Sequence, residues 1–270
     1  MDFMILASAP WSEWLLPGLA AAAYGVAAFG ARMPPALVRI TLLLAWLLHA
    51  VVIAAGLFSA SPHFGFAQAS SITVWLMMTV YLVESRLLPQ LKSYFMLAGF
   101  GSVALVLTVL FPGQPLPASQ SALLPLHWAF GIAAYGLFAV AVAHGWLMSR
   151  AEARIRQAKA PDAGLPLLKL ERLTFRFVTA GFVLLTATLL AGALFGEVLY
   201  GSAHLGWRWD HKRVFALLSW LVFATLLFGR WQFGWRGKRA LRMLYAGAAL
   251  LLLAYVGSRF VVEVVLERAA

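Results

Sequence analysis

Long apolar runs separated by short polar stretches dominate the sequence. The runs extend from Trp14 to Ala31, Ala36 to Phe58, Ala69 to Leu88, Leu91 to Phe111, Leu123 to Met148, Phe175 to Phe195, Val214 to Trp231 and Leu241 to Leu266. The length of each run is close to that of a membrane-spanning α-helix, which needs about 20 apolar residues. None alternates strictly, as a transmembrane β-strand would. The pattern therefore predicts an all-α polytopic integral membrane protein with about eight transmembrane helices.

The composition supports a single membrane domain over residues 1–270. Of these residues 63% are hydrophobic and 11% are charged, whereas a soluble domain carries about 25% charged residues. Cysteine is absent, which excludes disulfides, thiolate metal sites and reduction of a substrate by thiols of this chain. The formal net charge is +11, but the basic residues cluster between apolar runs, which is typical of membrane proteins and argues against a nucleic-acid partner.

The basic residues also predict an orientation. One set of alternate loops carries 16 Lys and Arg residues and the opposite set carries 5. Because basic loops are retained in the cytoplasm during insertion, both termini should face outward. The same rule makes the connection at about 150–172 cytoplasmic and places a Trp-containing loop at about 197–213 outside. A basic turn from Gly234 to Arg239 then faces the cytoplasm, as a topology anchor that also contacts anionic lipid.

Histidines are the natural cofactor ligands in a chain without thiols. His49 and His127 lie within apolar runs, and a histidine inside a membrane is either functional or hydrogen-bonded to a neighbouring helix. Both interpretations stay open for these two residues. His144 follows His127 by 17 residues on the same predicted helix, a rise of about 25 Å, so the two cannot ligate one metal. We expect a structural role for His144.

The predicted outward loop has a pattern that suits a flat aromatic ligand bearing carboxylates. Trp207 and Trp209 could stack on such a ligand, and Arg208 could pair with its acidic groups. Asp210 and His211 follow, and then two further cations, Lys212 and Arg213. The alternative is an aromatic belt at the membrane surface, where Trp is common and basic side chains reach toward water.

Several short motifs occur in an order that resembles the cytochrome c assembly family. They are Leu48-His49-Ala50, Leu126-His127 with Ala134-Tyr135-Gly136, Trp220-Leu221-Val222-Phe223, Gly234-Trp235-Arg236-Gly237, and Ala254-Tyr255 with Gly257-Ser258. This family contains haem-handling membrane proteins of the CcsA, ResC and CcmC type. Within it, the chain looks most like the eight-span branch of YpjD and HemX.

The resemblance implies a haem b site at the outer surface of a bacterial inner membrane. Trp207, Arg208, Trp209 and Asp210 match the end of the family's Trp-rich loop, and His127 matches an outward haem ligand. His49 matches a histidine within the membrane, so His127 and His49 are the expected metal ligands, with His211 lining the site. The chain departs from the family pattern at two places. The downstream outward histidine at the end of the last span is missing, and Leu266 lies near its position. The Pro-Lys-Glu that often follows the Trp motif is replaced by His211-Lys212-Arg213.

The implied function is haem binding and transfer rather than classical enzymatic turnover. It would serve cytochrome c biogenesis or haem homeostasis, with membrane lipid and other assembly or haem-pathway proteins as partners. The alternative is an accessory or regulatory membrane protein that keeps the fold without haem.

Overall fold

The computed structural model of the chain consists of two compact units, one ending at Leu116 and the other beginning at Pro117. It describes residues 11–30, 33–59, 61–87, 94–115, 123–157, 167–195 and 211–266. The division follows the fourth apolar run, so each unit contains four of the predicted spans. The single membrane domain expected from the sequence stays a prediction.

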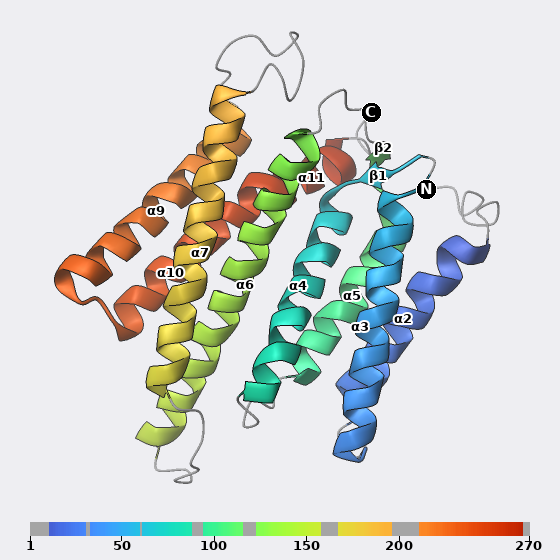
Figure 1. The fold of residues 1–270 in the computed structure, drawn as a ribbon, viewed down its shortest axis with the longest axis horizontal. Helices are drawn as coiled ribbons and strands as arrows, with labels where there is room; N and C mark the ends of the chain where they lie inside the picture. Colours follow the sequence, from blue (N-terminus) through green and yellow to red (C-terminus); the bar gives the residue numbers. More distant parts are fainter. Residues whose placement is uncertain are drawn as a thin grey trace. The chain divides into compact units, whose positions relative to one another are not determined.

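The described residues of unit 1 form a ring of four helices. Its elements are α2 (Trp11–Phe29), α3 (Pro35–Leu57), β1 (His63–Phe64), α4 (Phe66–Leu87), α5 (Tyr94–Leu110) and β2 (Gln114–Pro115). Each helix packs on the next along the chain, and α5 returns to α2 (Figure 1). β1 and β2 form a small antiparallel pair that joins Phe64 to Gln114. Gly113 beside it has φ +80° and lies on the Phe64 backbone, where a side chain would not fit.

Unit 2 repeats this arrangement with longer helices. Its elements are α6 (Leu123–Arg156), α7 (Leu167–Leu194), α9 (His211–Phe233), α10 (Gly237–Leu252), the π-helix η2 (Leu253–Gly257), α11 (Ser258–Phe260) and the π-helix η3 (Val261–Leu266). α6 packs on α7, α7 on α9 and α9 on α10, and α10 returns to α6 (Figure 1). The sequence predicts one apolar span over Leu241 to Leu266 and does not distinguish its π-helical turns from α-helix.

The polarity of the helices is that of a membrane protein. On α3, Leu37, Ile40, Leu44, Leu47 and Val51 are each 46–54% exposed. The buried polar and charged side chains among the described residues include His49, Ser71, Glu84, His144, Glu171, Thr174 and Ser219. Apolar side chains therefore face outward, where lipid would surround them, and a few polar ones face the helices.

Within the described ranges, six helices are long and apolar enough to cross a membrane. Two shorter apolar helices, Trp14–Phe29 and Phe95–Leu110, accompany them. These eight helices correspond to the eight apolar runs of the sequence. The prediction of an all-α polytopic membrane protein is confirmed.

The interior of unit 2 is organised by a pair of stacked rings. The Phe138 and Phe223 rings lie 3.8 Å apart, centroid to centroid, with 6° between their planes. Glycines on the neighbouring helices make room for them. A β-carbon at Gly181 would lie 3.1 Å from Phe138, and one at Gly247 only 2.8 Å from Phe223. Close approach of the backbones thus fixes how α7 and α10 pack around this stack.

Candidate functional site

His127 occupies the first turns of α6 and is half-buried. It faces the last turn of α7, where a β-carbon at Gly192 would lie 3.6 Å from the His127 Cε1 atom. The imidazole is therefore held against the neighbouring helix, and the small residue leaves room beside the ring. A histidine in this position can offer a ring nitrogen to a ligand at the end of the helix ring.

The first turn of α9 brings cationic groups to the same end of unit 2. Lys212 lies close enough to His127 for their charges to interact. Its ammonium is 4.9 Å from the centroid of the Tyr255 ring, within the range of a cation–π contact. His211 precedes it and is exposed. Two of the predicted site residues, His127 and His211, thus lie at one end of unit 2, together with Lys212.

The π-helical turn η2 supports this end of the unit. The Tyr135 hydroxyl, from α6, donates a hydrogen bond to the carbonyl oxygen of Leu251, just before the backbone changes from α-helix to π-helix. Such a turn changes the angular spacing of the side chains that follow, and π-turns are often found at functional sites. Here it places Tyr255 beneath the Lys212 ammonium.

The Trp-containing loop joins these same helix ends. Residues 196–210 connect the end of α7 with the start of α9. Trp207, Arg208, Trp209 and Asp210, which the sequence places in the site, lie outside the described residues. Their positions stay predictions.

His49 lies in unit 1, fully buried on α3. Its Nε2 is hydrogen-bonded to the Ser71 hydroxyl at 2.7 Å, and its ring contacts Tyr24 edge to face, with centroids 5.7 Å apart. Within the part of the chain that the structure describes, the His49 Nδ1 and the Tyr24 hydroxyl have no hydrogen-bond partner. The hydrogen bond to Ser71 on α4 is the helix-to-helix bond that a structural role of His49 would need. Its Nδ1, without a described partner, leaves the functional alternative open.

The described donors at this end of unit 2 are of the kinds that haem takes from a protein. Among the described residues, no three His, Cys, Asp or Glu side chains come together as a metal site. Haem needs only one or two axial ligands from the protein, together with cations for its propionates. His127 and Lys212 are of these two types and lie at one end of unit 2.

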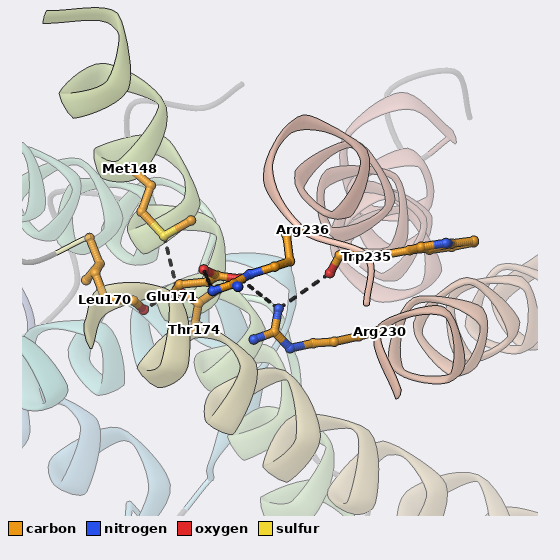
Figure 2. Close-up of polar contacts among 7 residues, drawn as sticks. All are labelled: Met148, Leu170, Glu171, Thr174, Arg230, Trp235 and Arg236. Atoms are coloured by element: carbon orange, nitrogen blue, oxygen red, sulfur yellow. Dashed lines mark hydrogen bonds and ion pairs between the residues drawn. The ribbon is translucent and has the colours of Figure 1, made fainter. Parts of the chain in front are cut away.

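The opposite end of unit 2 carries an ion-pair cluster that the sequence interpretation missed. Figure 2 shows the Arg230 and Arg236 guanidinium groups turned toward the Glu171 carboxylate. Arg230 Nη1 donates to Oε1 at 2.8 Å, while Arg236 donates from Nε to Oε1 at 2.9 Å and from Nη2 to Oε2 at 2.8 Å. These bonds raise the pKa of Arg236 above its ordinary value, so the guanidinium stays charged.

The Gly-Trp-Arg-Gly turn between α9 and α10 shapes this cluster. Gly234 and Gly237 have φ +63° and +58°, a conformation that favours glycine. The turn folds Trp235 back against Gly229, where a β-carbon would lie 2.3 Å from the ring. This places Arg236 over Glu171, from the start of α7. The motif thus has a structural role, because it ties the α9–α10 turn to α7.

Comparison with known proteins decides the family. The family described as "Cytochrome C assembly protein" matches residues 35–266, most of the chain. The chain belongs to this family. The family assignment predicted from the sequence is confirmed, and the chain is a multi-pass membrane protein of the cytochrome c assembly type.

Several relatives named "Cytochrome c biogenesis protein CcsA" match part of the chain. The protein of Prochlorococcus marinus strain NATL1A is 39% identical over 89 residues, which are 33% of this chain and 27% of the relative. Those of Cyanophora paradoxa and Synechococcus sp. strain WH7803 are 38% and 36% identical over the same length and shares. The matched stretch spans little more than a quarter of each relative. No solved structure matches the chain.

Proposed function

We propose that this cytochrome c assembly protein binds haem b at the end of unit 2 that carries His127. It would lie in a bacterial inner membrane and serve cytochrome c biogenesis or haem homeostasis. The observation that carries the proposal is that His127, at the start of α6, packs against the end of α7 and lies within range of the charge of Lys212, at the start of α9. The names of the CcsA relatives agree with a role in cytochrome c biogenesis.

Each residue then has a role that follows from its chemistry. His127 would supply an axial nitrogen, and Lys212 would pair with a propionate, held in place by the Tyr255 ring. Trp207 and Trp209 would stack along the porphyrin edge. His211 is exposed next to Lys212 and is our candidate for the second axial ligand.

Arg208 and Asp210 complete the predicted loop, Arg208 as a second cation for a propionate. Bound haem would supply an iron centre that exchanges ligands, and the half-buried His127 would hold it at the edge of the helix ring. His49 would act separately, within unit 1, through its free Nδ1. Other assembly proteins of the membrane would receive or deliver the haem.

The absorption spectrum of the purified full-length protein tests the proposal. We expect a Soret band after expression with ample haem. His127→Ala should shift that band and lower haem retention, because it removes a ligand nitrogen. The matched control is His144→Ala on the same helix, about 25 Å from His127 by helix rise. His144 is buried against Phe177, so this variant should keep the wild-type spectrum.

Three outcomes would contradict the proposal. A well-folded wild-type protein without a Soret band would favour the accessory function without haem. Equal spectra for wild type and His127→Ala would place the site elsewhere, as would haem loss in His144→Ala alone.

The orientation is tested separately. We propose that the haem end and both termini face outward, with residues 150–172 in the cytoplasm. Fused after Ala160, a reporter that is active in the cytoplasm should give a signal, and a reporter that is active only outside the cytoplasm should give none. A fusion there that is active only outside would reverse the orientation and move the haem end to the cytoplasmic side.

A further inference from the structure

The α9–α10 turn of unit 2 and the start of α10 carry more positive charge than Glu171, the carboxylate of α7 that binds there, can neutralise. Glu171 is bound to Arg230 and Arg236. Three further cations, Lys238, Arg239 and Arg242, follow on α10 and are exposed. Among the residues that the structure describes, no carboxylate forms a salt bridge with any of these three.

These three cations lie where their own helix does not favour positive charge. Lys238 and Arg242 are four residues apart, and Arg242 Nε donates to the Lys238 carbonyl oxygen at 3.4 Å, so both lie on one helix face. The first turn of α10 has no acidic residue, and its N-cap, Arg236, makes no side-chain cap hydrogen bond. Like charges at this spacing and cations at a helix N-terminus are both destabilising. An external anion would relieve both effects.

Exposed aromatic rings adjoin the cations. At the end of α9, Trp231 is 78% exposed and Phe233 is 65% exposed. The Arg239 guanidinium lies 3.7 Å from the centroid of Trp235, which is itself packed on Gly229. Aromatic residues at the ends of membrane-spanning helices lie at the level of the lipid headgroups. Phe233 stacks on Trp235, with ring centroids 6.3 Å apart, so Arg239 and these rings lie together at the depth of the lipid headgroups.

We infer that Lys238, Arg239 and Arg242, which begin α10 just after the exposed Trp231 and Phe233 at the end of α9, bind the headgroup of an anionic phospholipid of the surrounding bilayer. The headgroup phosphate meets the cations, and the rings contact the lipid beneath it. This site lies at the opposite end of unit 2 from His127. It is independent of haem, so lipid binding and haem binding can each fail without the other.

Lipid retention by the full-length protein tests this site. The protein is reconstituted into phosphatidylcholine bilayers with increasing phosphatidylglycerol, extracted in mild detergent, and analysed for bound phosphatidylglycerol. We expect preferential retention by wild type. The variant Lys238→Gln/Arg239→Gln/Arg242→Gln should bind about 100-fold more weakly, at about fivefold per cation. Lys238→Gln/Arg242→Gln, which leaves the contact between Arg239 and Trp235 intact, should bind about 25-fold more weakly.

The matched control removes the same charge from the same end of unit 2. Lys169→Gln/Arg172→Gln/Arg176→Gln takes three exposed cations from the first turns of α7, near Glu171. It should retain clearly more phosphatidylglycerol than the α10 triple variant, although both lose three positive charges. Equal losses in the two triple variants would show a general effect of charge and overturn the site.

A second arm separates lipid from a free anion. Phosphatidylglycerol should raise the unfolding temperature of wild type in the bilayer, and inorganic phosphate at the same concentration should not. Equal stabilisation by both would show a free-phosphate site instead of a lipid site. Wild type that retains no more phosphatidylglycerol than phosphatidylcholine would also overturn the inference.

Discussion

Replacing Glu171 by Gln should destabilise unit 2 at the end where α7, α9 and the α9–α10 turn meet. The amide keeps the shape of the carboxylate but removes its charge. Arg230 and Arg236, which donate three hydrogen bonds to Glu171, would then face each other without a counter-charge. Arg230 also lies over the Phe175 ring, 3.6 Å from its centroid, so it cannot leave the cluster freely.

The expected magnitude follows from the exposure of the partners. The Glu171 side chain is 12% exposed, that of Arg230 26% and that of Arg236 58%. Breaking a fully buried pair from one side costs about 3–5 kcal/mol, and an exposed pair contributes about 0–1 kcal/mol. The cluster lies between these limits, so Glu171→Gln should cost about 2 kcal/mol. For a chain of this size that lowers the unfolding temperature by about 5 °C.

Thermal unfolding in detergent, followed by intrinsic tryptophan fluorescence, measures this loss. The matched control is Glu152→Gln, because Glu152 and Arg156 form a looser pair at 3.7 Å with side chains 34% and 59% exposed. That pair contributes about 0.3–0.5 kcal/mol, so its loss should shift the unfolding temperature by at most about 1–2 °C. A Glu171→Gln protein as stable as wild type, or a control that loses as much, would refute the reasoning.

Three further variants test the packing and the haem end. Gly247→Ala should lower the unfolding temperature by several degrees, because the new methyl group would lie 2.8 Å from Phe223, and overpacking costs about 1–3 kcal/mol; Gly99→Ala, with no atom within 4 Å, should not. Tyr24→Phe should leave stability unchanged or slightly raised, because it removes a buried hydroxyl without a described hydrogen-bond partner; a clear loss would reveal a bound water or ligand there. If Lys212 pairs with a propionate as proposed, Lys212→Gln should weaken haem retention without shifting the Soret band, because no iron ligand is lost; a shifted band would refute that role.

Hydropathy identified the spans because it measures which side chains meet lipid. It located helix ends less well, because a helix continues beyond its lipid-facing part. The predicted span from Phe175 corresponds to α7, which begins eight residues earlier, at Leu167. The additional turns are polar and contain Glu171, whose partners hold them in place. The sequence pattern also did not predict the π-helical turns, because an apolar run does not distinguish π-helix from α-helix; the hydrogen bond from Tyr135 to Leu251, just before η2, joins segments 116 residues apart.

The site was predictable only in its separate parts. Chain order and charge pointed to His127 and Lys212 individually, but their proximity depends on how α6, α7 and α9 pack. The hydrogen bond between His49 and Ser71 joins two helices for the same reason. Glu171 had one signal, since it is the one carboxylate between the basic residues Lys169 and Arg176. Its partners are 59 and 65 residues away, and nothing in one sequence selects them.

The two ends of unit 2 should therefore act independently, although α7 connects them. Its start carries Glu171, and its end carries Gly192, which lies against His127; Gly192 follows Glu171 by 21 positions, a rise of about 30 Å. Effects of substitutions this far apart add when they share no partner. Glu171→Gln should then lower the unfolding temperature with the haem spectrum unchanged, and His127→Ala should change the spectrum and lower the unfolding temperature only as far as the lost haem had stabilised the protein. In the double variant the two effects should add within about 0.5 kcal/mol. A larger deviation would mean that haem binding changes the packing along the whole of α7.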